Sequence, residues 1–370
     1  MKRTLLSLAI VAACAAAVSC GNASSLRRAS VETCDIENQA TRKFLDETDY
    51  SADTAYVVST IADYRRDYGA KNDKPLPVVI SWTGGEASKV VLSTSSKFKD
   101  TFERPASSSP AEIFNLVPDV KYYYKVLGAD GSVLKTGCVM PVGPLRMIDG
   151  ISSNVRDLGG WKADGGHIAY GKLYRGGHLS SRMPDSGKAI FLNDLGITVD
   201  LDLRGIKESE ANVGPIIDGA IYAKFPVEKN LGRGTGNTEE LYQQAIRAII
   251  GWLGEGRAVY FHCAGGADRT GTLAFLIEAL VGVSESDMSK DYELTTYDGM
   301  NRRQRDFRAT EKETHILYET IVRLRHFGYP EVSSINKLAY IWATTRHSDS
   351  VDPLTKEEID LLRKYLIVKD

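Results

Sequence analysis

The sequence has few residues of the kinds that bind metals. Its 370 residues include six histidines and five cysteines, and none of these falls in an H-x-E, H-E-x-x-H or paired C-x-x-C spacing. Those spacings bring the ligands of zinc sites together. We therefore expect no metal in this protein and no other cofactor.

The sequence also lacks an excess of positive charge. Lysine and arginine total 46, aspartate and glutamate total 48, and the formal net charge is -2. Loss of an N-terminal segment that carries Lys2 and Arg3 leaves 44 basic against 48 acidic residues, or -4. Proteins whose main partner is nucleic acid usually present a broad basic surface, so we expect no nucleic-acid partner.

The N-terminal apolar run is about 15 residues long, whereas a transmembrane helix needs roughly 20. A basic start precedes the run and small residues around a cysteine follow it, which is typical of a secretion signal. Both Cys14, in VAAC, and Cys20, in AVSC, resemble the cysteine of a bacterial lipobox. Cleavage before Cys14 would leave a second apolar stretch, so we predict a lipoprotein signal peptide over residues 1–20 with Cys20 lipidated.

This prediction places the protein outside the cytoplasm, anchored by its lipid in the bacterial cell envelope, at the periplasm or the outer-membrane surface. A plain secretory signal without lipid is the alternative. Residues 21–49 are polar and weakly patterned, and we interpret them as a tether that becomes ordered toward its end. Cys34 and Cys138 either form a disulfide in that compartment or are two small buried residues.

Residues 50–143 have a β pattern. Residues 77–82 and 89–95 are rich in β-branched side chains, and GADGS at residues 128–132 is a hairpin-turn signal. Several short strands with turns between them predict an N-terminal β-sandwich. The segment resembles a fibronectin type III domain through Trp82 and an L-x-P-x-x-x-Y-x-x-x-V pattern formed by Leu116, Pro118, Tyr122 and Val126, with Tyr124 on the same strand face.

After Pro144 the pattern changes to alternating strands and helices, which predicts an α/β domain over residues 145–370 with a mainly parallel sheet flanked by helices. Buried-strand candidates span residues 197–203, 221–227 and 258–262, and residues 238–253 have helical spacing behind Asn237 or Thr238. Further amphipathic helices are expected over residues 284–297, 305–327, 334–345 and 354–367.

The stretch from Tyr260 to Gly271 reads YFHCAGGADRTG and joins the last of those strands to a helix. The C-x5-R spacing of Cys263 and Arg269 places a thiol and a guanidinium around a glycine-rich turn at a helix N-terminus. Such a turn directs backbone N–H groups toward an anion. We therefore predict a phosphate-binding loop made of Cys263 and the residues that follow it: Ala264, Gly265, Gly266, Ala267, Asp268 and Arg269.

Each side chain of this loop has an expected role. Cys263 is the nucleophile, and it must be a thiolate to attack phosphorus. Arg269 holds two phosphate oxygens in its planar fork, and Thr270 donates its hydroxyl to the departing thiolate. Asp268 is the nearest candidate for the general acid, although it could instead bind backbone and order the loop. His262 is expected to order the loop by hydrogen bonds.

The whole HCAGGADRTG stretch resembles the signature of the cysteine-dependent protein tyrosine phosphatases. SNVRDLGGW from residue 153, GKLYRGGHLS from residue 171, DLRGIKESE from residue 202 and DYELTTY from residue 291 resemble the bacterial tyrosine, dual-specificity and lipid phosphatase branch in order and spacing. The resemblance implies a phosphatase-type fold, phosphomonoester substrates and a loop aspartate that acts as acid, since no Trp-Pro-Asp loop is found. It also implies that Arg156 and Asp157 lie near the active site, unless they are a structural ion pair.

One departure from the branch concerns Ala267, where a lysine often precedes the loop aspartate. Its absence removes a charge that could contact a second phosphate. We therefore expect a protein tyrosine or dual-specificity phosphatase acting on a phosphorylated protein or a small phosphomonoester. The alternatives are an inositol-phosphate or phospholipid phosphatase, and a catalytically silent lipoprotein that binds phosphate or a partner.

Overall fold

The computed structural model describes residues 30–47, 74–206, 214–228, 231, 237–298, 320–321, 323–325, 332 and 334–370. The predicted signal peptide, Cys14, Cys20, much of the predicted tether and most of the helix expected over residues 305–327 lie outside these residues. No helix in the described part of the chain is long and apolar enough to cross a membrane.

The chain divides into two compact units. One consists of residues 1–32, 79–111 and 121–140, and the other of residues 33–78, 112–120 and 141–370. This division assigns residues 112–120 to the second unit, whereas the sequence pattern assigns them to the sandwich. The domain boundaries drawn from the sequence stay a prediction.

The first unit is built on antiparallel strands. β3 (Ala87–Ser93), β4 (Thr101–Pro105), β6 (Tyr122–Gly128) and β7 (Val133–Val142) belong to a sheet of order β1-β7-β6-β3-β4, in which β1 is Glu32–Asp35. A second sheet pairs β2 (Val78–Ile80) with β5 (Ala111–Ile113). Burial alternates along β6, with Tyr122, Tyr124 and Val126 on the buried face, as the sequence predicts. The resemblance to a fibronectin type III domain stays a prediction.

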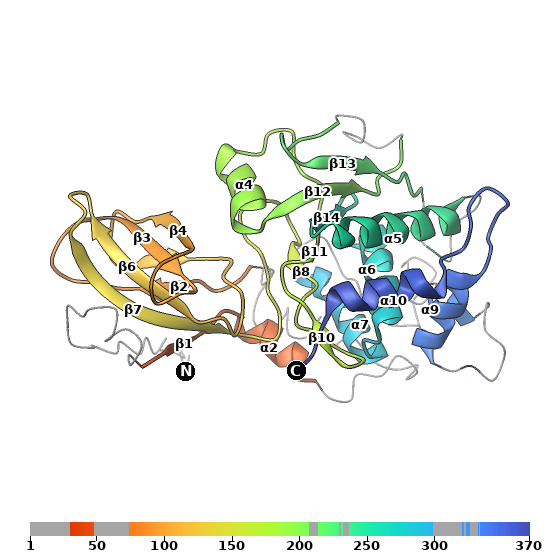
Figure 1. Cartoon of the computed structure of the whole chain (residues 1–370), viewed down its shortest axis with the longest axis horizontal. Helices are drawn as coiled ribbons and strands as arrows, with labels where there is room; N and C mark the ends of the chain where they lie inside the picture. The colour runs from red at the N-terminus through yellow and green to blue at the C-terminus, as the bar shows by residue number, and fades with distance from the viewer. Residues whose placement is uncertain are drawn as a thin grey trace, which may run out of the picture. The chain divides into compact units, whose positions relative to one another are not determined.

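A mixed five-stranded sheet forms the centre of the second unit (Figure 1). Its order is β13 (Ile221–Lys224), β12 (Ile197–Asp202), β14 (Ala258–His262), β11 (Leu173–Gly176) and β8 (Arg156–Asp157). The first four strands are parallel, and β8 is antiparallel to β11. The three strands expected from the sequence are therefore present, β14 with the predicted bounds. The prediction that residues 221–227 form a buried strand is wrong, because β13 lies at the edge of the sheet and its side chains are exposed or half-buried.

Hydrophobic side chains on the two faces of this sheet belong to different clusters. Val259 and Phe261 of β14 pack with α5 (Thr238–Gly254), α6 (Asp268–Val281), α9 (Ile335–Thr344) and α10 (Lys356–Leu366). Tyr260, between them, packs on the other side with η1 (Ile190–Asp194), which follows α4 (Asp185–Ala189). Because successive strand residues point to opposite faces, β14 is buried on both sides.

α6 is followed by α7 (Glu285–Glu293) and the short η2 (Leu294–Asp298). Gly282 ends α6 in the left-handed conformation, with φ 91°, and the side chain of Ser284 caps α7 by accepting from the amide of Asp287. A small sheet pairs β15 (Ile367–Val368) with β10 (Gly166–Ile168) and β10 with β9 (Lys162–Ala163).

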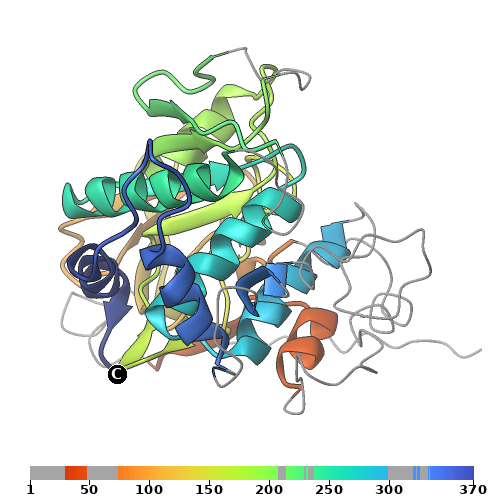
Figure 2. The ribbon, with the colours of Figure 1, turned by 90° about the vertical axis from the view of Figure 1, so that its right-hand side faces the viewer.

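One part of the predicted tether is folded. Residues 39–45 form α2 (Gln39–Leu45), and Ala40 and Phe44 are buried in the core of the second unit. The hydroxyl of Tyr297 donates to the carbonyl of Ala40 at 3.0 Å, and Lys290 Nζ donates to the carbonyl of Leu45 at 2.7 Å. Figure 2 shows α2, in orange-red, beside the light-blue segment of the chain that holds Lys290 and Tyr297. The tether therefore does not extend through α2.

Cys34 and Cys138 are free thiols in this structure. Cys138 is buried, and its Sγ lies 3.5 Å from the carbonyl oxygen of Ser30. The structure therefore has no disulfide between them, and of the two only Cys138 is the small buried residue that the sequence analysis gave as the alternative, since Cys34 is half-buried.

Candidate active site

The predicted phosphate loop (Cys263–Arg269) joins the end of β14 to the start of α6. Cys263 is 3% exposed at the end of the strand, Ala264 is exposed, and Asp268 and Arg269 lie half-buried in the first turn of the helix. Among the described residues, no side chain caps the N-terminus of α6. The helix amides and the positive end of the helix dipole are thus available to an anion at this loop.

Gly266 requires glycine for two reasons. Its φ is 67°, in the left-handed region, and a Cβ atom there would lie 2.3 Å from the backbone carbon of Gly176. The loop therefore turns back against the segment that follows β11. The turn is possible because neither glycine carries a side chain at the contact.

The carbonyl groups of the loop accept hydrogen bonds from the protein around it. The Ala264 carbonyl accepts from the amide of His178 at 3.1 Å and lies 2.9 Å from its Nδ1. Asn154 Nδ2 donates to the Gly265 carbonyl at 3.2 Å, and Arg175 Nη2 donates to the Gly266 carbonyl at 3.0 Å. Three loop carbonyls are therefore bound by groups outside the loop, an arrangement that favours amides facing an anion on the inner side.

Asp291 of α7 holds two arginines behind the loop. Its Oδ1 accepts from Arg156 Nε at 2.7 Å, and its Oδ2 accepts from Arg175 Nη1. Arg156 also donates to the Asn154 side chain at 2.7 Å, so both loop-binding side chains trace back to one carboxylate. All four of these residues are at most 1% exposed. We call Asn154, Arg156, Arg175 and Asp291 the loop clamp.

The environment of Cys263 favours the thiolate. Burial alone would raise the pKa of the thiol, but the charge of Arg269 and the hydroxyl and amide of Thr270 outweigh it and lower the pKa below its ordinary value. The charge of Asp268 opposes this effect in part. A lowered pKa is the property that a nucleophilic cysteine needs.

Arg269 is placed by its backbone as well as its side chain. Its Nη1 donates to the carbonyl of Val227 at 3.2 Å. The backbone carbonyl of Arg269 accepts from the hydroxyl of buried Tyr242 at 3.3 Å. Val227 lies just after β13, so the guanidinium connects the phosphate loop to the segment that follows this edge strand. The role of Arg269 in holding phosphate oxygens stays a prediction.

Asp268 accepts a hydrogen bond from the hydroxyl of Tyr292 at 3.1 Å. Tyr292 lies on α7 beside Asp291, and its ring would be 2.6 Å from a Cβ atom at Gly271. The small residue at position 271 therefore allows α6 to pack against α7. The phenol of Tyr292 holds one oxygen of the Asp268 carboxylate, which is consistent with Asp268 ordering the loop. The other carboxylate oxygen does not take part in this bond.

His262 is a structural residue in this arrangement. Its Nε2 lies 3.0 Å from Oδ1 of Asp200 on β12, and its Nδ1 lies 3.1 Å from the Cys263 carbonyl. Burial alone would lower the pKa of His262, but the charge and hydrogen bond of Asp200 outweigh it and raise the pKa. The imidazole ring thus links the strand to the loop backbone.

Arg156 and Asp157 do not pair with each other. They are neighbours on β8, so their side chains point to opposite faces. Arg156 belongs to the loop clamp, whereas Asp157 accepts from Arg146 at 3.2 Å and from the amides of Gly159 and Gly171. Arg156 therefore supports the loop, and Asp157 instead braces the glycine turn that follows β8.

Four supporting residues were missed as such by sequence reasoning: Asn154, Asp200, Asp291 and Tyr292. Three of them lie in motifs that the family resemblance marks, but no local pattern shows which group each one contacts. Asp200 offers the clearest signal, because a carboxylate inside an apolar strand needs a buried partner. Among the described residues, no group of three or more histidine, cysteine or acidic side chains could hold a metal ion.

The sequence profile described as tyrosine phosphatase family matches residues 148–367. A protein of Cupriavidus necator strain H16, named as a candidate tyrosine-protein phosphatase, is 28% identical over 181 residues, covering 43% of this chain and 64% of that protein. The chain thus spans less than two thirds of the length of that relative.

Two solved structures show a weaker likeness. P. aeruginosa TpbA gives a TM-score of 0.31 at 12% identity, covering 48% of this chain and 91% of that one. The core catalytic domain of the PP-IP phosphatase SIW14 from S. cerevisiae gives a TM-score of 0.29 at 16% identity, covering 38% and 79%. At these TM-scores the two structures carry no conclusion about fold or substrate.

Proposed function

The chain belongs to the tyrosine phosphatase family, and we propose that it hydrolyses phosphomonoesters through a cysteinyl-phosphate intermediate without a metal. The observation that carries this proposal is the placement of Cys263. Its thiol, with a lowered pKa, lies at a helix N-terminus inside a loop whose carbonyls are bound by groups outside the loop.

The reaction runs in two steps. The Cys263 thiolate attacks phosphorus and the bond to the leaving oxygen breaks, while Arg269 and the loop amides hold the charged equatorial oxygens. Water then attacks the cysteinyl phosphate, and the thiolate leaves with a hydrogen bond from Thr270. The leaving oxygen takes its proton from Asp268, which returns to the acid form by accepting a proton from the attacking water.

Hydrolysis of para-nitrophenyl phosphate by the full chain tests the mechanism. We expect turnover by the wild type that vanadate blocks and a chelator leaves unchanged, and none by Cys263→Ser. The matched control is Cys138→Ser, which removes a buried thiol outside the loop and keeps the activity. Equal activity in Cys263→Ser would disprove the covalent step.

The role of Asp268 is tested with leaving groups of different basicity. Asp268→Asn should lose far more rate on phenyl phosphate than on para-nitrophenyl phosphate, because only the poorer leaving group needs the proton. Glu228→Gln is the variant to compare with Asp268→Asn, because Glu228 is a second carboxyl near the loop: it follows Val227, whose carbonyl accepts from Arg269. If Glu228→Gln shows that leaving-group dependence and Asp268→Asn does not, the acid lies after β13.

We assign the substrate to phosphotyrosine-type monoesters, on a protein or a small molecule. Ala267 supports this choice, since its side chain is buried and uncharged and offers nothing to a second phosphate. A panel of phosphotyrosine peptide, phosphoserine peptide, inositol phosphates and phosphoinositide vesicles decides the matter. Faster hydrolysis of the inositol compounds than of the phosphotyrosine peptide would contradict the assignment.

The protein is further proposed to be exported and anchored through lipid on Cys20, with a fibronectin type III-like domain before the phosphatase domain. Metabolic labelling with an alkyne fatty acid in a bacterial host tests the anchor. The label should be lost in Cys20→Ala and kept in Cys14→Ala. The reverse pattern would move the anchor to Cys14, and no label in the wild type would leave a plain secretion signal.

A further inference from the structure

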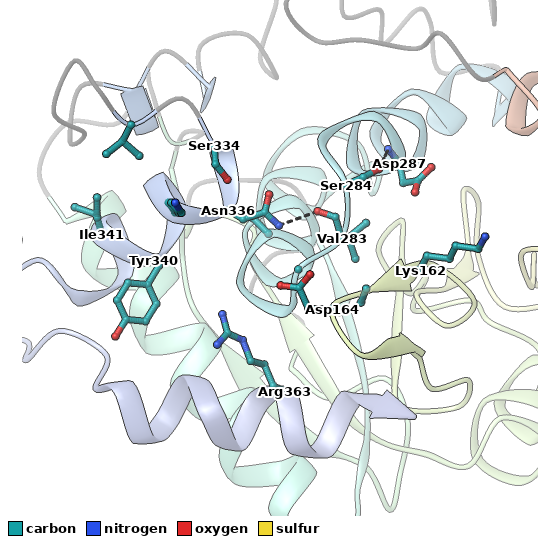
Figure 3. Close-up of a pocket in the computed structure, with 15 residues that line it drawn as sticks. Lys162, Asp164, Val283, Ser284, Asp287, Ser334, Asn336, Tyr340, Ile341 and Arg363 are labelled. Carbon is teal, nitrogen blue, oxygen red and sulfur yellow. Dashed lines mark hydrogen bonds between the residues drawn. The ribbon is translucent and has the colours of Figure 1, made fainter. Parts of the chain in front are cut away.

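A cavity of about 820 Å³ lies in the second unit, at the opposite end of α6 from the phosphate loop. The turn between α6 and α7, the turn between β9 and β10, and helices α9 and α10 surround it (Figure 3). Sites for drug-sized ligands have volumes of roughly 300–1,000 Å³. This cavity has the size of a ligand site, and a single amino acid would leave much of it empty.

Arg363 provides a fixed cation in the cavity. Its Nε donates to the carbonyl of Leu280, in the last turn of α6, at 2.8 Å. The guanidinium points into the cavity from α10 (Figure 3). Its Nη1 also lies 3.7 Å from Oδ1 of Asp360 on the same helix. A guanidinium held through Nε presents its two terminal nitrogens as a fork that matches a carboxylate.

Asp164 provides the opposite charge. Its side chain points into the cavity from the turn between β9 and β10 (Figure 3). Its Oδ2 would lie 2.4 Å from a Cβ atom at Gly282, so the carboxylate packs directly on the glycine that ends α6. The C-terminus of a helix carries partial negative charge, so Asp164 and the helix end together attract a cation.

Apolar and neutral polar groups line the space around these charges. Val283, Tyr340 and Ile341 supply apolar surface. Asn336 donates through Nδ2 to the carbonyl of Val283 at 2.9 Å, which turns its Oδ1 away from that carbonyl as an acceptor for an N–H group. The cavity thus combines a receptor for a carboxylate, one for an ammonium group, an amide acceptor and apolar walls.

We propose that this cavity binds a short peptide with free termini, whose carboxylate pairs with Arg363 and whose ammonium group pairs with Asp164. A backbone N–H of the peptide donates to Asn336, and an apolar side chain packs on Tyr340 and Ile341. Lys162, Lys337 and Asp287 also line the cavity, so its walls carry both signs of charge. A ligand with both a carboxylate and an ammonium group matches such walls better than a simple organic anion or a simple amine.

The cavity is connected to the phosphate loop by two helices. α6 begins at the loop and ends at the cavity, and its 14 residues span about 21 Å. α7 begins at the cavity and carries, near its other end, Asp291 of the loop clamp and Tyr292, which binds Asp268. A peptide between the two helix ends contacts both elements that position the loop. This part of the inference, a change in hydrolysis rate, rests on the proposed function.

Binding is measured first, without catalysis, on full-length Cys263→Ser. The probe is an equimolar mixture of tripeptides with free termini, compared with the same mixture acetylated at the N-terminus or amidated at the C-terminus. We expect the free tripeptides to raise the Tm by a few degrees and each capped mixture to give no rise. An equal rise with capped peptides, or none with free ones, overturns the proposal.

Variants then locate the site. Arg363→Gln and Asp164→Asn should each raise the Kd for the tripeptides at least tenfold. The Kd is obtained from the rise in Tm that the tripeptides cause, relative to the Tm of the same variant without ligand. Arg257→Gln, which changes a half-buried arginine outside the cavity, is the matched control and should bind normally. Unchanged binding in both cavity variants overturns the site.

The rate of para-nitrophenyl phosphate hydrolysis by the wild type, with and without the tripeptides, is the second readout. A change in kcat that Asp164→Asn abolishes supports the connection through the helices. Binding without any change in rate overturns the connection and leaves the site. A wild type that binds the tripeptides but hydrolyses nothing even in their absence contradicts the proposed function only.

Discussion

Replacing Asp291 with asparagine removes a negative charge that two buried guanidinium groups share. Arg156 and Arg175 are both fully buried, and each donates to one oxygen of this carboxylate. Asparagine keeps the shape but presents an amide donor to one of the two arginine donors. Breaking a buried ion pair costs about 3–5 kcal/mol, so we expect a loss of unfolding free energy in this range.

The size of this loss of unfolding free energy depends on the protonation state of Glu278. Burial first, and then the charge of Asp291, raise the pKa of Glu278 well above its ordinary value, which favours the neutral carboxyl in the wild type. In Asp291→Asn the repulsion is gone and two guanidiniums lack a counter-charge, so Glu278 ionises and partly replaces Asp291. We expect a cost of about 3 kcal/mol for Asp291→Asn alone and about 5 kcal/mol in a Glu278→Gln background.

The four proteins of this cycle are unfolded with urea at pH 7 and followed by circular dichroism. Glu278→Gln alone should change the unfolding free energy by less than about 1 kcal/mol, because it replaces one neutral group by another. The activity of folded Asp291→Asn should fall by about tenfold or more, since Arg175 no longer holds the loop carbonyls in place. A cost below 1 kcal/mol for Asp291→Asn, or an equal cost in both backgrounds, would refute this reasoning.

Three further predictions concern titrating groups. Alkylation of Cys263 by iodoacetamide should show a pH midpoint below that of an ordinary thiol, and Thr270→Ala should move the midpoint up, because it removes a hydroxyl that favours the thiolate; an unmoved midpoint would contradict this. His262 has a raised pKa in the folded state, so its stabilising effect is complete below about pH 6.5 and is lost as the pH rises through the folded pKa. His262→Asn should therefore lose more unfolding free energy at pH 6 than at pH 9, and a larger loss at pH 9 would show that the imidazolium is not the stabilising form. Burial raises the pKa of Glu37 to about 8, so stability falls as the pH rises from about 4.5 through 8. Glu37→Gln should have the Tm of the wild type at pH 4 and a higher Tm at pH 9, and equal Tm values at both would exclude a buried carboxylate.

Much of the fold of the second unit could be predicted from sequence because the signals are local. β14 has the bounds that its apolar run predicts, and α5, α7, α9 and α10 each follow a residue of a helix-capping type, although only Ser284 before α7 and Thr355 before α10 form the cap hydrogen bond. α2 was missed because its seven residues are too few for a clear helical period, and what fixes them is the burial of Phe44 in a distant core.

The order of the sheet was not predictable in the same way. Alternating burial shows that a strand is covered, but it does not show which strand lies beside it. The antiparallel edge strand β8 is only two residues long, and it joins the sheet through pairing with β11. Pairing of this kind depends on residues brought together by the rest of the fold.

The sequence by itself determined the chemistry of the site, because the thiol, the arginine and the glycines that bring them together lie within one short turn between a strand and a helix. Only the tertiary structure decided what holds that turn open to an anion. Asn154, Arg175 and Asp291 come from separate segments, up to 137 residues apart in the printed sequence, and the partner of Arg156 proved to be Asp291 and not the adjacent Asp157. Neighbours on a strand point apart, so a buried charge finds its partner across the fold, where no local spacing records it.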